Sequence, residues 1–394
     1  MAALRRGPAH GNRELRLDHL VVAHLLAFFN ASVESLRRIE DVFESADVRK
    51  RLNLPRVPKS TLSDAQRVLD PELLRPLLEH LQRHIPQLRD HGRLDGLRGD
   101  PQLENLVREL VAVDGTFFAV APRVAWALYN KPNAPDAAPR QGCVRVDVHF
   151  DLLAGVPEQA VVSGGRLAEQ DSLVAHLKPG RLYVIDRALQ GYQHMADIVA
   201  AGSDFVTRLR EGSAVFEVLA ERPLSLAERR AGVTRDTQVA VPSPRAAPLA
   251  DTPLRQVDLG YVDRDGQTQS LRLFTNRLDL TAETIALIYR HRWQIELFFR
   301  WLKCLVGWKH FFSESQNGVT LQVYVALIAT LLLAIEVGDR PSVYDYAMMN
   351  HVVSGLIPLD QAKVILERRR RERQRARQRA QERAAQRRAE KTAP

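Results

Sequence analysis

Residues 289–303 read Tyr289-Arg-His-Arg292-Trp-Gln-Ile-Glu296-Leu-Phe-Phe-Arg300-Trp-Leu-Lys303, and this stretch constrains fold and function more than any other part of the chain. On an α-helix, at about 100° per residue, the side chains of Tyr289, Arg292, Glu296 and Lys303 fall within an arc of roughly 60°. Arg300 falls close to the same stripe. One carboxylate therefore lies in a row of cations and a phenol, an arrangement that suits a metal ligand flanked by phosphate-binding groups.

The same helix has a second face that is apolar. It consists of Ile288, Ile295, Phe298, Leu302 and Leu305, which recur at helical spacing and predict docking on a core. The alternative for the charged stripe is a solvated face with ion pairs between residues four apart, such as Glu296 and Arg300. Two further carboxylates upstream favour the metal-site interpretation.

Charge is concentrated near the end of the chain. The 394 residues, enough for two or three domains, carry a net charge of +9 from 56 basic and 47 acidic side chains, which favours an acidic partner. Residues 367–391 hold 12 basic and 4 acidic side chains, and so +8 of this +9. The remainder is close to neutral, so a nucleic-acid surface on it must come from local clustering. The tail has a helix-forming composition without an apolar face.

Cysteine content and hydropathy indicate the cellular compartment. Cys143 and Cys304 lie far apart without partner motifs, so the sequence predicts neither a disulfide framework nor a zinc site, and a reducing compartment fits. No secretory signal pattern is recognisable near residue 1. The most apolar run, residues 323–335, is too short to span a bilayer and predicts a buried helix. We expect a soluble intracellular protein.

The hydrophobic period changes along the chain. Residues 15–98 show helical spacing, and the segment Pro58–Asp64 resembles a helix start; a helix-turn-helix-like DNA reader and a plain helical bundle both fit it. Strands are predicted from residue 106 onward, at 110–113, 117–128, 143–152, 155–162, 182–185 and 205–209, with a helix at 190–201. Runs buried on both faces are typical of an α/β sheet covered by helices.

This pattern predicts five segments. Residues 211–280 interrupt the α/β pattern and read as a β-rich insertion, after which come the helix with Glu296 and a second buried helix near 319–336. The predicted boundaries are 1–104 for a helical N-terminal domain, the candidate DNA-binding domain, 105–210 for the first part of an α/β core, 211–280 for the insertion, 281–345 for the closing helices of the core and 346–394 for a C-terminal region with the Arg-rich tail.

Asp114 and Asp186 each follow an apolar strand, and Glu296 projects from a helix. Three carboxylates without a supporting His or Cys cluster suit hard divalent cations, Mg²⁺ or Mn²⁺. Two such ions about 3.5–4 Å apart can activate a water or a 3′ hydroxyl and stabilise the leaving oxygen of a phosphodiester. The alternative for each Asp is a plain polar residue at the end of a strand.

With these residues the chain resembles the DDE transposases of bacterial insertion sequences, of the insertion-sequence-four type. That group carries a Tyr, two residues, Arg, three residues, Glu, six residues, Lys signature, which Tyr289, Arg292, Glu296 and Lys303 match at every spacing. The segment 113–116, Val-Asp-Gly-Thr, resembles the motif of the first Asp, and 185–187, Ile-Asp-Arg, resembles that of the second. The resemblance covers about residues 15–340.

The resemblance implies an RNase H-like catalytic core with a β-rich insertion between the second Asp and the Glu. It implies an enzyme that cuts at the ends of its own element and joins them to target DNA, with two Mg²⁺ or Mn²⁺ ions held by Asp114, Asp186 and Glu296. Tyr289, Arg292, Lys303 and Arg300 are the expected phosphate contacts. Double-stranded DNA, as terminal inverted repeats and as target, is the expected partner of a DNA-bound homodimer in the bacterial cytoplasm and nucleoid.

Trp293 has two interpretations, stacking on an unpaired base or packing in the core. Two other functions also stay open for the chain. One is a catalytically silent DNA-binding protein derived from a transposase, and the other is a metal-dependent RNase H-like nuclease that never joins strands.

Overall fold

The computed structural model describes residues 15–390 apart from 31, 86–105, 107–108, 121–123, 130–140, 165–172, 187–190, 210–215, 263–265 and 307–310. By its internal contacts the chain divides into two compact units. One consists of residues 92–303, and the other combines residues 1–91 with 304–394. The two ends of the chain thus contribute to one unit.

The unit built from both ends is helical, and its core contains one long apolar helix, α13 (Gln316–Val337). Ser315 caps the start of α13 by accepting the Gly318 N–H, and Gly338 ends it in the left-handed conformation. By length and composition α13 could cross a membrane, but 89% of its apolar window is buried inside the structure, as in the core helix of a soluble protein. The predicted buried helix is confirmed, slightly longer than expected.

Most of the helices before residue 84 pack with α13. The helices in this range are α1 (Leu17–Phe28), α2 (Leu36–Glu44), α3 (Ala46–Leu52), α4 (Lys59–Val68), the 3-10 helix η2 (Pro71–Leu74) and α5 (Arg75–Arg83). α1, α4, η2 and α5 contact α13, and the Tyr324 hydroxyl of α13 donates to Glu72 at 2.7 Å. The predicted helices are therefore present over residues 17–83, but they share their compact unit with the C-terminal helices.

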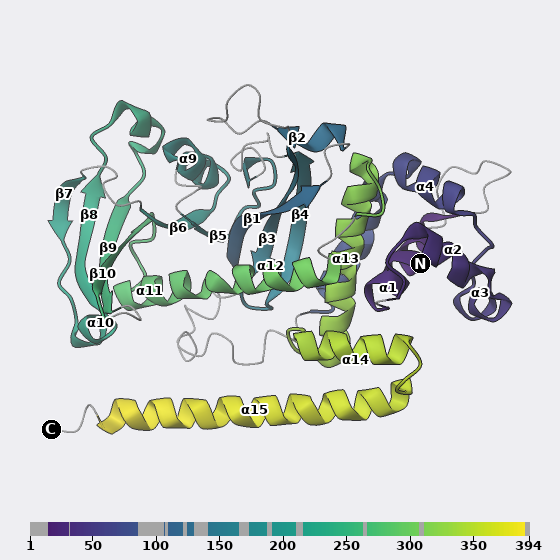
Figure 1. Cartoon of the computed structure of the whole chain (residues 1–394). Coiled ribbons are helices and arrows are strands. Elements are labelled where there is room, and N and C mark those ends of the chain that lie inside the picture. The colour runs from purple at the N-terminus through teal and green to yellow at the C-terminus, as the bar shows by residue number, and fades with distance from the viewer. Residues whose placement is uncertain are drawn as a thin grey trace. The chain divides into compact units, whose positions relative to one another are not determined.

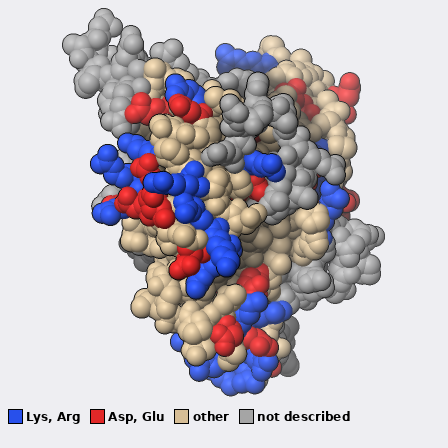
Figure 2. All heavy atoms as spheres, turned by 90° about the vertical axis from the view of Figure 1, so that its right-hand side faces the viewer, with Lys and Arg blue, Asp and Glu red and all other residues tan. Residues whose placement is uncertain are grey.

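The charge on these helices is mixed. Figure 2, which faces the side of α2, α3 and α4, shows basic and acidic side chains interspersed on that face. Within residues 36–68, charged side chains pair with one another, including Arg56 with Glu44 at 3.0 Å and Arg67 with Asp64 at 2.6 Å. A DNA-binding role for this region stays a prediction.

The other unit contains a sheet of ten strands (Figure 1). These are β1 (Leu110–Val120), β2 (Leu128–Tyr129), β3 (Gln141–Asp151), β4 (Val156–Gly164), β5 (Leu182–Ile185), β6 (Asp204–Arg208), β7 (Glu217–Glu221), β8 (Val233–Ala240), β9 (Leu254–Val262) and β10 (Thr268–Thr275). Their order is β2-β3-β1-β5-β6-β10-β9-β8-β7, and β4 also pairs with β3. β1 is antiparallel to β3 and parallel to β5, and β5 is parallel to β6.

One predicted strand boundary is wrong. The sequence placed Asp114 at the end of a strand, with a second strand at 117–128, whereas β1 runs on through Asp114 to Val120. The reason is continuous pairing with β3, from Val111 opposite Asp151 to Val120 opposite Gly142. Residues 128–129 form the short β2, after the 3-10 helix η4 (Ala125–Ala127). The backbone of Asp114 is therefore fixed by pairing with β3 both before and after this residue.

The β-rich segment continues the same sheet. β10 pairs antiparallel with β6, and β9, β8 and β7 follow in order. One face of the combined sheet is covered by α9 (Tyr192–Ala200) and the 3-10 helix η6 (Pro244–Leu249). Met195 and Ile198 of α9 share a buried cluster with Val113 of β1, Ile185 of β5 and Phe274 of β10, so a single core spans the first strands of the sheet and the insertion.

The long helix expected from about residue 281 is two helices in succession, α11 (Ala282–His291) and α12 (Trp293–Val306), with a turn at Arg292. At this turn the backbone N–H groups of Arg292 and Ile295 bond to oxygens only three residues back. The predicted apolar face is confirmed for Ile288, Ile295, Phe298 and Leu302, each at most 3% exposed. The side chain of Leu305 lies outside the described residues.

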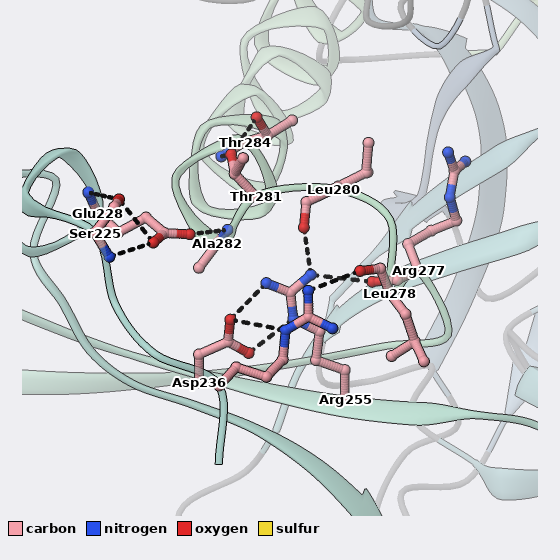
Figure 3. A network of polar contacts seen from close by, with 11 residues as sticks. Ser225, Glu228, Asp236, Arg255, Arg277, Leu278, Leu280, Thr281, Ala282 and Thr284 are labelled. Carbon is pink, nitrogen blue, oxygen red and sulfur yellow. Dashed lines mark hydrogen bonds and ion pairs between the residues drawn. The ribbon is translucent and has the colours of Figure 1, made fainter. Parts of the chain in front are cut away.

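A polar network joins the insertion to the start of α11 (Figure 3). The guanidinium of Arg255 is fully buried, pairs with both carboxylate oxygens of Asp236 at 2.8 and 2.7 Å, and donates to the Leu280 carbonyl at 2.5 Å. Glu228 of α10 (Leu226–Arg230) accepts the Ala282 N–H at 2.9 Å. The insertion thus holds the loop before α11 and satisfies one free N–H at its first turn.

Helix α15 (Leu359–Glu390) contains the Arg-rich tail, and its described packing contacts lie in its first half. Ala362 and Leu366 pack on Met348 of α14 (Val343–Val353). Arg373 then pairs at 3.0 Å with Asp345, whose side chain is fully buried. After Arg373, the described side chains of Arg375, Arg379 and Arg383 are exposed.

Candidate active site

The sheet register brings Asp114 and Asp186 side by side. β1 and β5 are parallel with Val113 opposite Ile185, and each Asp is the next residue along the chain. Because side chains alternate between the faces of a strand, positions 114 and 186 lie on the face opposite the core that contains Val113 and Ile185. The Gly115 N–H donates to Asp114 Oδ1 at 2.8 Å and helps to fix this carboxylate.

Helices α11 and α12 supply the other groups on this face. Phe298 of α12 packs against Phe150 of β3 with ring centroids 5.3 Å apart, and this contact holds α12 on the side of Asp114. The Tyr289 hydroxyl at the end of α11 donates to Asp186 Oδ1 at 3.0 Å. Burial and the charge of Asp186 raise the pKa of the Tyr289 phenol well above its ordinary value, so the phenol stays a neutral hydrogen-bond donor.

The guanidinium of Arg292 lies among the three carboxylates. Its Nη2 is 2.8 Å from Glu296 Oε1 and 3.8 Å from Asp186 Oδ2, and its Nη1 is 3.5 Å from Asp114 Oδ2. The side chain is only 10% exposed. Burial alone would lower the pKa of Arg292, but the charge of Asp186 and the hydrogen bond to Glu296 outweigh it and raise that pKa. Asp114, Asp186 and Glu296 therefore converge on one point.

This donor set suits a hard divalent cation, because it supplies only carboxylate oxygens. The carboxylates are reachable from solvent, with side-chain exposures of 22% for Asp114, 31% for Asp186 and 30% for Glu296. Among the described residues, no three acidic, His or Cys side chains lie close enough together to hold a metal ion as they stand. The chemistry of the donors thus fits, while the cation between them in this structure is Arg292.

The other residues of the stripe lie farther along the helix. Trp293 is 51% exposed, which argues against its packing in the core, and the Arg300 guanidinium lies over its ring at 5.8 Å from the centroid. Lys303 is half-buried seven residues beyond Glu296. The alternative of a solvated face expected an ion pair between Glu296 and Arg300. In the structure Glu296 bonds to Arg292 instead, and Arg300 stacks on Trp293.

A buried ion pair behind Asp114 was not predicted from the sequence. Arg145 Nε donates to Asp147 at 2.7 Å, and both side chains are less than 8% exposed. A Cβ on Gly115 would collide with the Asp147 carboxylate and the Arg145 guanidinium, so any larger residue after Asp114 would have to displace this ion pair. The sequence did contain a signal for this pair, since Arg145 and Asp147 alternate along β3 with the valines of its apolar face.

Comparison with known proteins places this geometry in context. The model of the transposase DDE domain family matches residues 105–332. The putative transposase y4zB of Sinorhizobium fredii is 30% identical over 159 residues, which are 40% of this chain and 43% of that protein. The probable transposase for insertion sequence element IS5377 of Geobacillus stearothermophilus is 33% identical over 102 residues, 25% of this chain and 27% of that protein. A putative transposase for insertion sequence element IS4SA of Synechocystis is 39% identical over 51 residues, 13% of this chain and 15% of that protein. The chain thus matches less than half the length of each relative.

Proposed function

The chain belongs to the transposase DDE domain family, and we propose that it is a DNA transposase that cuts at the ends of its insertion sequence and joins them to target DNA. The observation that carries this proposal is the convergence of Asp114, Asp186 and Glu296 on one guanidinium, from two adjacent strands and a helix. The RNase H-like core is part of the proposal. Its support is the strand order β4-β3-β1-β5-β6, in which three antiparallel strands are followed by two parallel to β1.

We assign the ligation of two Mg²⁺ or Mn²⁺ ions to Asp114, Asp186 and Glu296. When bound, the ions would activate the attacking oxygen and stabilise the leaving oxygen of the scissile phosphodiester. Tyr289 orients the Asp186 carboxylate through its hydrogen bond. Arg292, Arg300 and Lys303 are the proposed phosphate contacts, and the exposed ring of Trp293 offers a stacking surface for an unpaired base.

The test of this function is cleavage of DNA that carries the element's ends. We expect strand cleavage with Mg²⁺ or Mn²⁺, none with excess chelator, and recovery when the metal is restored. Joining of the cut ends to a second duplex would separate a transposase from a nuclease. Specific binding without cleavage at any metal concentration would support the silent DNA-binding protein instead. Short inverted repeats flanking the gene are the cheapest supporting observation, and they would supply the substrate.

The Arg-rich part of α15 gives a second prediction. Arginine recurs at every fourth residue from 371 to 387, which keeps Arg375, Arg379 and Arg383 within an arc of roughly 80° on the helix. We propose that this stripe binds DNA phosphates. Replacing all three with Gln should weaken binding of end DNA and unrelated duplex alike, and should reduce the salt dependence of binding by up to about 2.7 in log–log slope, at roughly 0.9 per contact.

A variant with the same loss of charge elsewhere is the control. Arg229, Arg230 and Arg245 are exposed residues of the other unit, and their triple replacement by Gln should change the slope far less. Fluorescence anisotropy with labelled duplexes across a salt series measures both quantities. Equal slopes for the two triple variants would remove α15 from the DNA-binding surface.

A further inference from the structure

The carboxylate site already contains a positive charge. Three acidic side chains surround the guanidinium of Arg292 at 2.8, 3.5 and 3.8 Å, so three negative charges share one positive charge. Without it, the carboxylates would repel one another in a site where exposure of each is below one third. Two carboxylates that share a site cannot readily both ionise, and a cation between them removes this penalty. Arg292 therefore supplies charge where the proposed metals would.

Arg292 nevertheless makes few hydrogen bonds for a buried arginine. Only its bond to Glu296 is a short hydrogen bond, and its Nε and Nη1 have no hydrogen-bond acceptor among the residues that the structure describes. Arg255 shows the contrast, because it makes two short bonds to Asp236 and donates to two backbone carbonyls. A guanidinium with unsatisfied donors loses less on leaving its site than one whose donors are all bonded.

We propose that Arg292 is a resident counter-cation of the carboxylate site, which keeps Asp114, Asp186 and Glu296 assembled in the metal-free protein and competes with divalent cations for them. This inference rests on the proposed function only in taking a divalent cation as the competing ligand. A divalent ion bound to these carboxylates and a guanidinium at its present distances of 2.8–3.8 Å from them would repel each other at close range. Occupancy by the ion therefore requires the Arg292 side chain to move out.

Two consequences follow for the free protein. Its affinity for divalent ions is lower than the carboxylates alone would give, since each ion must displace Arg292. The displaced guanidinium stays on the turn between α11 and α12, four residues before Glu296, and so becomes available to a phosphate beside the metals. Metal entry would thereby prepare the same residue for contact with DNA.

The experiment measures Mn²⁺ binding by isothermal titration calorimetry on the full chain without DNA, after removal of metal with chelator. Arg292→Gln keeps a hydrogen-bonding side chain but removes the charge. We expect it to bind Mn²⁺ at least about fivefold more tightly than the wild type, the low end of the usual coupling between two bound groups. Arg290→Gln is the matched control, because it removes an exposed charge at the end of α11, two residues from Arg292, and should leave the affinity within about twofold.

Melting curves separate competition from a purely structural role. In chelator, Arg292→Gln should melt below the wild type, because the three carboxylates lose their counter-cation. Saturating Mn²⁺ should raise the melting temperature of this variant more than that of the wild type. Unchanged or weaker Mn²⁺ affinity in Arg292→Gln, or an equal melting deficit with and without Mn²⁺, would overturn the inference while leaving the proposed function intact. Absence of Mn²⁺ binding in both proteins would overturn the metal assignment itself and the inference with it.

Discussion

Replacing Asp114, Asp186 or Glu296 by Ala should abolish cleavage of end-bearing DNA while DNA binding persists. Each carboxylate is a proposed metal ligand, and metal ions contribute several kcal/mol of transition-state stabilisation. Since about 1.36 kcal/mol corresponds to a factor of ten in rate, we expect single-turnover cleavage to fall by roughly 10³-fold or more for each variant. Quench experiments at saturating protein, with anisotropy on the same DNA, measure rate and binding separately.

The fold of each variant has to be checked, because every one of these carboxylates pairs with Arg292. Melting curves serve this purpose. Asp251→Ala, which removes an exposed carboxylate of the same unit, is the matched control and should cut normally. A folded Glu296→Ala variant that cuts at the rate of this control would show that the assigned site is wrong.

Among the proposed variants, Arg255→Met should lower the free energy of unfolding the most. The Arg255 side chain is fully buried, and the Asp236 side chain that it pairs with is 3% exposed. Without Arg255, the Asp236 carboxylate keeps its ion pair with Arg222, whose Nε is farther away, at 3.4 Å. Breaking a buried ion pair by removing one partner typically costs about 3–5 kcal/mol. Urea unfolding followed by circular dichroism should show this loss in the free energy of unfolding. Because the network holds the loop before α11, cleavage should also fall at temperatures where the variant stays folded.

An exposed ion pair made by Arg235 of β8, the residue before Asp236, provides the control. Arg235 pairs with Glu221 at 2.5 Å, with side-chain exposures of 47% and 60%, so Arg235→Met should cost less than about 1 kcal/mol. The double variant Arg255→Met with Asp236→Leu, which removes both charges, should recover part of the loss. A single Arg255→Met variant as stable as Arg235→Met would show that the buried pair does not hold the insertion.

The strands that position the site could be predicted because their signals are local. The apolar runs that end before Asp114 and Asp186 and the alternation from Val144 to Phe150 depend only on which faces are buried, and the structure has strands there. The family could be predicted because residues 289–303 carry four residue types, Tyr, Arg, Glu and Lys, at set spacings. These features need no knowledge of how distant segments pack.

Features decided by tertiary contacts could not be predicted. All five residues of β7 are exposed, so no hydrophobic period marks that strand, and only its pairing with β8 reveals it. The continuation of β1 past Asp114 depends on the length of β3 opposite it. The position of Arg292 between three carboxylates requires the register of β1 and β5, which single-sequence periodicity does not contain.

The partial docking of α15 has a consequence for the protease sensitivity of the chain. After Arg373 about 17 residues, or about 25 Å of helix, carry many arginines whose described side chains are solvated. A helical segment of this length whose described arginines are exposed gains little stability from packing, so it is marginally stable and opens often, which exposes its peptide bonds to trypsin. The docked turns, held by Arg373 on Asp345 and by Leu366 in its apolar cluster, open far more rarely. Brief digestion should therefore trim the end of α15 in a ladder of small steps, and the last step of that ladder should lie close to residue 373.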